Sequence, residues 1–107
     1  MEERLDRVHH VAVTVADLKK AIQWYQTSFF CTVAYEDERQ AVLQFENIRV
    51  LLLLPSHEPT HLAFYRKDAK LFGELRKQRD GGQQTVIADP TGNMVKLVCS
   101  DEDAKSE

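Results

Sequence analysis

The sequence predicts an α+β domain built from two copies of one supersecondary unit. A run of β-forming residues, Val8–Val15, leads directly into a helix start at Asp17. The spacing from histidine to aspartate, seven residues from His10 to Asp17, recurs fifty-one residues later between His61 and Asp68. Strand side chains alternate between two faces and helical positions repeat about every 3.6 residues, so each copy is predicted as a strand followed by a helix.

Length and composition are those of one soluble globular domain. The chain has 107 residues, of which 43% are hydrophobic and 29% charged, as in typical single domains. The longest apolar run, Val50–Leu54, is much shorter than the roughly 20 residues that a membrane helix needs. The charged first residues lack the apolar stretch of a secretory signal. We therefore expect no membrane partner and a cytoplasmic location.

The net charge argues against a nucleic-acid-binding protein, and the cysteines argue against a metal or redox site built on thiols. The net charge of -3 argues against a nucleic-acid partner, because phosphate binding usually requires a basic face. Cys31 and Cys99 form no Cys-x-x-Cys pair and stand among apolar residues. We expect both to be free, buried thiols rather than metal ligands or redox groups.

The first module, about residues 8–54, is predicted as βαβββ. In its first strand, Val11, Val13 and Val15 alternate with the residues that include His10. Asp17 is predicted to cap a helix whose apolar residues recur at helical spacing. This helix covers the valine face, which leaves His10 on the opposite face of the sheet. Three further strands are predicted over 31–35, 40–46 and 48–54, separated by polar turns.

A linker bounded by prolines, residues 55–59, precedes the second module, about residues 60–99. His61 and Tyr65 share one face of its first strand. Asp68 is predicted to cap a second helix that ends at Gly81-Gly82. Strands are predicted over 85–89 and 94–99, so the second module is βαββ, one strand shorter than the first. The polar, acidic tail, residues 100–107, is predicted to fray.

Four motifs, in this order, resemble the vicinal oxygen chelate superfamily, which includes glyoxalase I, bleomycin-resistance proteins, methylmalonyl-CoA epimerase and extradiol dioxygenases. The motifs are His9–Leu18, Trp24-Tyr25, the strand that opens at His61, and Asp89–Asn93. The resemblance spans nearly the whole chain, from Val8 to Val98. It implies two βαβββ-type modules, the second one shortened, that form a curled mixed sheet with a cleft. It also implies a homodimer, which often completes that cleft.

The resemblance further implies where a metal would be bound. In glyoxalase-like members the metal is held by residues that match His10 and His61, together with a carboxylate or amide in the last strand of each module. Here the first of those strand positions falls at Val50 or Leu52, and the second at Lys96. An apolar side chain offers no donor, and an ammonium group repels a divalent cation. The usual four-ligand metal site is therefore not expected, nor is the chemistry of glyoxalase I.

The resulting hypothesis is a small-molecule-binding protein of the glyoxalase/bleomycin-resistance type that needs no cofactor. Its expected ligand-binding residues are His10, Thr14, His61, Tyr65 and Lys96. A cleft with a lysine, two histidines and two hydroxyl groups favours a small anion such as a carboxylate or a phosphate. Bleomycin-resistance proteins are a precedent, since they sequester a ligand without catalysing a reaction. No catalytic residue is assigned.

Two alternatives stay open. One is a metal-dependent lyase, isomerase or dioxygenase in which His10 and His61 bind a divalent metal with an atypical third ligand. Glu46, His57 and Glu58 are the candidates for that ligand, although none stands where the family pattern places one. The other is a structural or regulatory dimer whose cleft has degenerated, in which both histidines are hydrogen-bonded residues of a concave surface.

Overall fold

The chain is α+β, as predicted, in a computed structural model that describes residues 5–78 and 82–105. It divides into two compact units, which are described separately: a central unit, His10–His61, and a terminal unit, Met1–His9 with Leu62–Glu107. Both cysteines are free; Cys99 is buried and Cys31 half-buried. Burial raises the pKa of the Cys99 thiol, which makes it a poor nucleophile. No helix in the described residues is long and apolar enough to cross a membrane.

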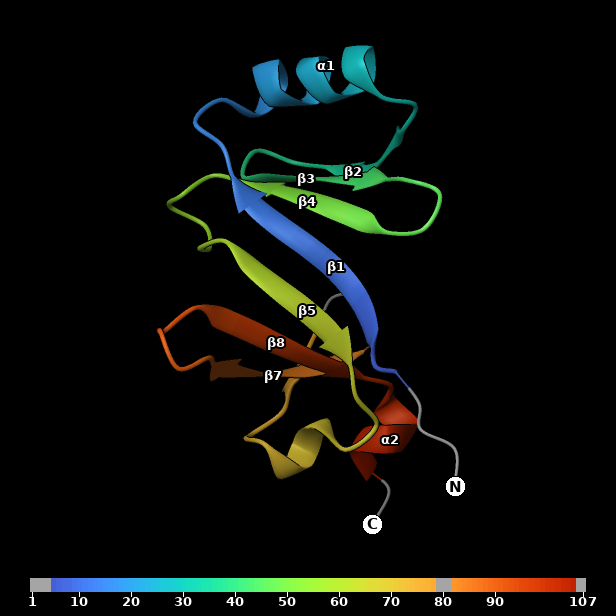
Figure 1. Cartoon of the computed structure of the whole chain (residues 1–107), viewed down its shortest axis with the longest axis vertical. Helices are drawn as coiled ribbons and strands as arrows, with labels where there is room; N and C mark the ends of the chain where they lie inside the picture. Colours follow the sequence, from blue (N-terminus) through green and yellow to red (C-terminus); the bar gives the residue numbers. More distant parts are fainter. Residues whose placement is uncertain (1–4, 79–81, 106–107) are drawn as a thin grey trace. The chain divides into compact units, whose positions relative to one another are not determined.

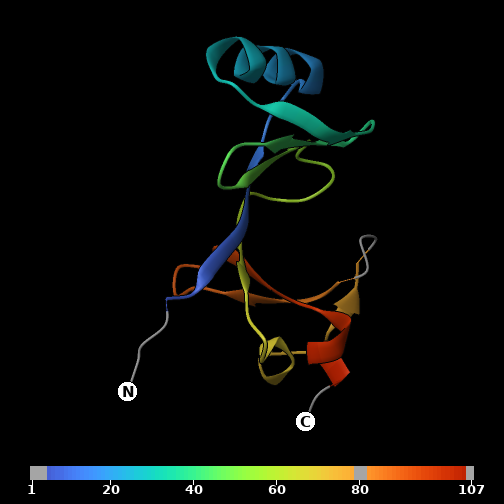
Figure 2. The same ribbon diagram turned by 90° about the vertical axis from the view of Figure 1, so that its right-hand side faces the viewer.

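The central unit contains a parallel strand pair within an otherwise antiparallel arrangement. Its elements are β1 (Arg7–Thr14, which begins in the terminal unit), α1 (Leu18–Ser28), β2 (Thr32–Glu36), β3 (Gln40–Gln44) and β4 (Arg49–Leu53). The strand order is β2-β3-β4-β1, with β1 parallel to β4. This is the βαβββ order predicted for the first module. Figure 1 shows α1 as a layer beside β2, β3 and β4, and the turned view agrees (Figure 2).

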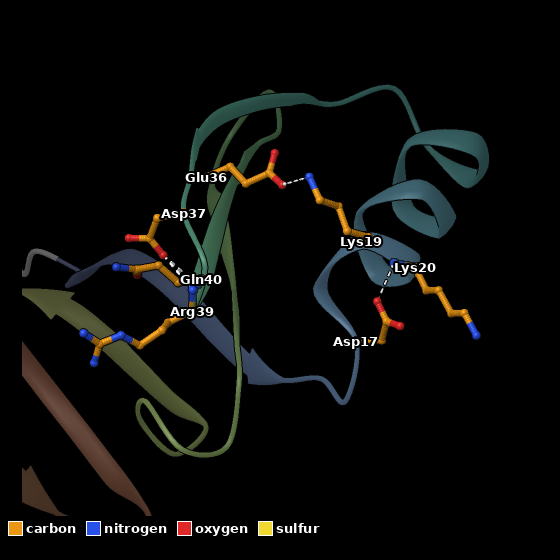
Figure 3. A network of polar contacts seen from close by, with 7 residues as sticks. All are labelled: Asp17, Lys19, Lys20, Glu36, Asp37, Arg39 and Gln40. Atoms are coloured by element: carbon orange, nitrogen blue, oxygen red, sulfur yellow. Dashed lines mark hydrogen bonds and ion pairs between the residues drawn. The ribbon is translucent and has the colours of Figure 1, made fainter.

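Local signals explain where α1 begins and ends. The Asp17 carboxylate accepts a hydrogen bond from the backbone N–H of Lys20 at 3.0 Å, as expected of an N-cap (Figure 3). At the other end, Phe29 is extended, with φ −140° and ψ 158°. No described residue other than glycine has a positive φ. The helix therefore ends without a left-handed residue, which explains why no glycine marks its end.

The core of the central unit lies between α1 and one face of the strands. Leu18 and Ile22 of the helix pack against buried residues of β3 and β4, and the valine face of β1 joins them. The buried members are Leu18, Ile22, Ala41, Leu43 and Leu52, with Val13, Val15, Val33 and Val50 among the partly buried ones. This confirms that α1 covers the valine face. His10 occupies the alternate face of β1, as predicted from strand parity.

Besides the start of β1, the described residues of the terminal unit form four strands and two short helices. They are β5 (His61–Tyr65, whose first residue closes the central unit), η1 (Ala69–Leu71), β6 (Arg76–Lys77), β7 (Gln83–Ala88), β8 (Met94–Cys99) and α2 (Asp101–Lys105). The strand order is β5-β8-β7-β6. Its core contains Ala69, Leu97 and Cys99, against which Phe64, Leu75, Ile87, Val95 and Ala104 pack.

The long second helix predicted from Asp68 is wrong: the structure has a single 3₁₀ turn, η1. Asp68 makes no side-chain cap, because both its carboxylate oxygens accept hydrogen bonds from Arg66, each at 2.9 Å. Gly73 follows η1 where the backbone passes close to β7; a Cβ there would lie 2.5 Å from the Thr85 hydroxyl oxygen. The predicted helix end includes Gly81, which lies outside the described residues.

Two further differences concern the end of the second module. The strand predicted to be missing is present as the two-residue β6, paired antiparallel with β7. The shortening of this module therefore lies in its helix rather than in its number of strands. The tail predicted to fray forms α2 up to Lys105, where Ser100 accepts a hydrogen bond from the backbone N–H of Asp103 at 3.1 Å. Residues 106–107 of that tail lie outside the described range.

The turn between β7 and β8 is built on Asp89. Its carboxylate accepts hydrogen bonds from the backbone N–H groups of Thr91 and Asn93 and from the Asn93 amide, at 2.8 to 3.0 Å. These bonds stabilise the charged carboxylate and lower the pKa of Asp89. Gly92 has φ 100°, a conformation that glycine adopts without strain. The predicted turn is confirmed, with glycine at the position that requires it.

Candidate functional site

His10 and His61 meet in the central unit. Their Nε2 atoms are 3.0 Å apart, and the rings are nearly perpendicular, at 80° with centroids 5.2 Å apart. Only 7% of His10 and 2% of His61 is exposed. The sequence repeat therefore identified two residues that the fold does bring together, through β1 and the first residue of β5. Buried ring nitrogens need hydrogen-bond partners, and here the two rings supply one to each other.

The hydrogen bonds assign the proton positions in this pair. His61 Nδ1 lies 2.9 Å from the carbonyl oxygen of Pro59. A carbonyl oxygen only accepts, so Nδ1 of His61 carries the proton and its Nε2 is an acceptor in the neutral ring. His10 must then donate from its own Nε2. The Pro59 carbonyl, at the end of the linker, thus binds Nδ1 of His61 and leaves its Nε2 to face His10.

Strand register places Arg49 beside His10. In the parallel pair of β1 and β4, His10 lies opposite Arg49 and Val11 lies opposite Val50. Paired residues on neighbouring strands share a face, so Arg49 lies on the face of His10 and Val50 on the helix-covered face. The same register puts Leu52 with Val13.

This register corrects one expectation. Val50 and Leu52 were expected at the position of a metal ligand, but both pack in the core under α1. The residues of β4 that do share the face of His10 are Arg49, Leu51 and Leu53. None of them offers a carboxylate or an amide, so the expectation that β4 supplies no metal ligand is unchanged.

Arg49 belongs to a row of polar side chains that crosses four strands. Thr32 pairs with Gln44, Gln44 with Arg49, and Arg49 with His10, so the four side chains stand side by side on one face. Arg49 Nε donates to Gln44 Oε1 at 2.8 Å. The Gln44 amide donates in turn to the carbonyl oxygen of Phe45, at 2.6 Å. We call Thr32, Gln44, Arg49 and His10 the polar row.

Sequence reasoning missed Arg49 and Gln44. Arg49 stands directly before an apolar run and carries no motif of its own. Only the register between β1 and β4, a contact between residues about forty positions apart, shows that it faces the same side as His10.

The other predicted ligand-binding residues are distributed over both units. Thr14 is exposed and its backbone N–H donates to the Thr60 hydroxyl at 3.3 Å, within the central unit. Tyr65 belongs to the terminal unit; it is 46% exposed and its ring contacts His9 edge-on, with centroids 4.8 Å apart. Lys96 also belongs to the terminal unit, in β8, and is 6% exposed. It pairs with Val86, on the face away from the core of that unit.

A shallow pocket of about 320 Å³ lies elsewhere, between α1 and β2 on the helix-covered side of the central unit. Lys19 Nζ and Glu36 Oε2 form an ion pair at 2.9 Å beside it (Figure 3). Its lining residues are Lys19, Ile22, Gln23, Gln26, Thr27 and Glu36. None of the predicted site residues is among them.

Comparison with known proteins identifies the fold. No family model and no curated protein matches the sequence. Solved structures do match, among them a glyoxalase/bleomycin resistance protein/dioxygenase superfamily member from Vibrio splendidus 12B01. It is 14% identical with a TM-score of 0.71, over 90% of this chain and 100% of that one. The chain has the vicinal oxygen chelate fold.

Further structures of this fold give the same result at similarly low identity. A Streptomyces coelicolor methylmalonyl-CoA epimerase variant is 18% identical with a TM-score of 0.68, over 92% of this chain and 99% of that one. A hypothetical protein from Bacillus halodurans C-125 is 14% identical, also with a TM-score of 0.68, over 97% and 99%. These likenesses establish the vicinal oxygen chelate fold, which the four sequence motifs predicted.

Metals are common in vicinal oxygen chelate proteins, but the described side chains of this chain do not suit the usual metal site. No cluster of three or more His, Cys, Asp or Glu side chains suited to a metal occurs in residues 5–78 and 82–105. His10 and His61 supply two nitrogen donors, whereas a protein-bound zinc ion takes three or four protein ligands. Glu46, His57 and Glu58 do not converge on them in any such cluster. The described residues therefore do not fit the four-ligand metal site of this fold.

Proposed function

We propose that the chain is a small-molecule-binding protein whose ligand lies on the face of the central unit that carries His10. The supporting observation is the polar row, which sets Arg49 and His10 side by side on that face. Arg49 and Thr32 are exposed and Gln44 is half-buried, so a ligand can reach them. Converging polar groups beside an apolar surface are the usual features of a small-molecule site.

The charge on this face favours an anionic ligand. The strand residues of the central unit that point to it include one cation, Arg49, and no carboxylate; they are His10, Ala12, Thr14, Thr32, Tyr35, Gln40, Val42, Gln44, Arg49, Leu51 and Leu53. Guanidinium groups bind carboxylates and phosphates through paired hydrogen bonds. Lys96 and Tyr65, in the terminal unit, remain proposed ligand-binding residues of that unit.

Similar structures suggest the first compounds to try. Methylmalonyl-CoA epimerase has been solved with methylmalonyl-CoA, and the Streptomyces coelicolor enzyme with 2-nitronate-propionyl-CoA. Both compounds carry an anionic group on a short acyl chain. Methylmalonyl-CoA, malonate, acetate and phosphate therefore form a sensible starting set for this chain.

A thermal-shift titration of the full chain tests the proposal. A compound that binds the folded state should raise the melting temperature with the concentration dependence of RT ln(1 + [L]/Kd). The shift should shrink in Lys96→Met if that lysine contributes. If no anion in the set stabilises the protein, the proposal fails. Sedimentation equilibrium on the same samples measures whether the expected homodimer forms.

The metal-dependent alternative is tested by metal analysis of protein purified without chelator. Our proposal predicts no stoichiometric metal, because two nitrogen donors hold a divalent ion weakly. Stoichiometric metal that disappears in the double variant His10→Ala, His61→Ala would overturn the proposal in favour of the metal-dependent enzyme.

A further inference from the structure

The face that carries His10 is divided into a polar row and an apolar row. The apolar row is formed by Tyr35, Val42, Leu51 and Ala12, which pair across β2, β3, β4 and β1 in the same way as the polar row. Resting on the proposed function, we propose that the ligand is an amphipathic acid. Its acid group binds Arg49, and its apolar body lies on Tyr35, Val42 and Leu51.

The hydrogen bonds of Arg49 leave one side of its guanidinium group for a ligand. Nε is engaged by Gln44, and Gln44 is itself held by the Phe45 carbonyl. A guanidinium group has five N–H donors. Among the described residues, the terminal nitrogens of Arg49 make no hydrogen bond. These two nitrogens form the fork that binds a carboxylate or a phosphate with two parallel bonds. Gln44 is a positioning residue, since it restricts the orientation of that fork.

The apolar row presents surface rather than further polar groups. Tyr35 is 38% exposed, and its hydroxyl donates to Asp37 Oδ2 at 2.7 Å, in the adjoining turn. Because that bond engages the hydroxyl, the exposed surface of the ring is the part of Tyr35 that would contact a ligand. Val42 and Leu51 are half-buried, so each retains some accessible surface beside it.

The spacing between the rows sets the size of the ligand. Residues two apart on a strand share a face, and each residue advances the strand by roughly 3.3 Å, so the rows are about 7 Å apart. An acid group joined to a branched or aromatic group by two or three bonds spans that distance. Acetate is too short to contact both rows, whereas 3-phenylpropionate reaches from one to the other.

Of the two carboxylates at the end of β2, one is turned away from this face and the other is hydrogen-bonded within the turn. Glu36 pairs with Ala41 on the helix-covered side and binds Lys19. Asp37 accepts from the Tyr35 hydroxyl and from the backbone N–H groups of Arg39 and Gln40. These partners of the two carboxylates are all residues other than Arg49.

Isothermal titration of the full chain with three matched probes tests the inference. The probes are 3-phenylpropionate, acetate, which has only the acid group, and 3-phenylpropanamide, which has only the apolar body and a neutral head. We expect 3-phenylpropionate to bind at least about tenfold more tightly than either of the others. Equal affinities for acetate and 3-phenylpropionate would overturn the inference.

Matched variants assign the acid group to Arg49. Arg49→Gln should weaken 3-phenylpropionate roughly tenfold and leave the amide unchanged, because only the acid uses the charge. Arg49→Lys keeps the charge but lacks the fork, so it should also weaken the acid. Arg39→Gln, which removes an exposed guanidinium from the β2–β3 turn, is the control and should bind normally.

Two further results separate this inference from the proposed function. Val42→Thr, which replaces one methyl group by a hydroxyl, should lower the affinity for 3-phenylpropionate but not for acetate. If acetate, malonate or phosphate binds but Arg49→Gln has no effect on any acid, this inference fails and the proposed function stands. If no probe binds at all, both fail.

Discussion

The Nε2 atoms of His10 and His61 lie 3.0 Å apart, within hydrogen-bond distance, and we assign His10 as the donor. The direction of this bond follows from the Pro59 carbonyl, which holds the proton of His61 on Nδ1. We therefore expect opposite tautomers in the two neutral rings: Nδ1–H in His61 and Nε2–H in His10. Two-bond ¹H–¹⁵N correlation spectra of the imidazole rings distinguish the tautomers directly. Finding both rings as Nε2–H would contradict the assignment.

The pair should also contribute to stability as a unit. His10→Ala leaves the buried Nε2 of His61 without this partner, which costs about 1–3 kcal/mol of unfolding free energy beyond the loss of packing. The reverse variant, His61→Ala, should cost a similar amount. In the double variant the two losses of unfolding free energy should not add, and the coupling energy should be about 1 kcal/mol. Urea denaturation of the wild type, both single variants and the double variant measures it. Additive costs would show that the hydrogen bond contributes nothing to stability.

Elements of the central unit were predictable because their signals are local. Asp17 stands directly before a helical apolar pattern, and it does cap α1. The alternation around His10 placed it on the face away from α1, and the packing of Val13 and Val15 under the helix agrees. Each of these inferences needs only residues within about two turns of one another.

The second helix was wrongly predicted because one local and one tertiary contact override its signals. Asp68 resembles a cap in sequence, but its carboxylate is taken by Arg66, two residues earlier. Gly73 is required by the close approach of Thr85, twelve residues later. The helical spacing of apolar residues, on which the prediction was based, shows neither of these contacts.

The candidate site was predictable only in part for a similar reason. The repeat and the parity of two strands brought out His10 and His61. The pairing of β4 with β1 decides which face of the sheet Val50, Leu52 and Arg49 occupy. A shift of one residue in that pairing would move each of them to the opposite face. The polar row could therefore not be read from the sequence.

Removing the cap of α1 should destabilise the protein without affecting the face of His10. Asp17→Ala deletes the acceptor for the Lys20 N–H, which should cost about 1 kcal/mol of unfolding free energy. Asp17→Ser retains a capping oxygen and should recover most of that loss. Chemical denaturation measures both; an equal cost for alanine and serine would show that the cap is not the cause.

A methyl group at residue 73 should lower the stability of the fold, and the size of this loss should depend on Thr85. In Gly73→Ala the new Cβ would lie 2.5 Å from the Thr85 hydroxyl oxygen, and overpacking of this kind typically costs about 1–3 kcal/mol. Thr85→Ala removes the atom that is too close. The double variant Gly73→Ala, Thr85→Ala should therefore be less destabilised than the sum of its single variants, as judged by melting temperature. Simple additivity would place the cause elsewhere.

Acid should weaken the turn between β7 and β8, because the pKa of Asp89 is lowered in the folded state. The Asn93 amide is the largest cause, followed by the backbone N–H of Asn93, with a smaller contribution from the Thr91 N–H. A carboxyl whose folded pKa lies below its unfolded value of about 3.9 stabilises the fold above that pH. This contribution is lost as the pH falls through the folded pKa.

The contribution of Asp89 can be isolated by comparing the wild type with Asp89→Asn. The wild type should be the more stable protein near neutral pH, and the difference in unfolding free energy should shrink below about pH 4. Carboxyl ¹³C titration by NMR should place the pKa of Asp89 below its ordinary value, and Asn93→Ala should raise it again, because the largest stabilising hydrogen bond is removed. A stability difference that is the same at neutral and acidic pH would mean that the charge of Asp89 does not stabilise this turn.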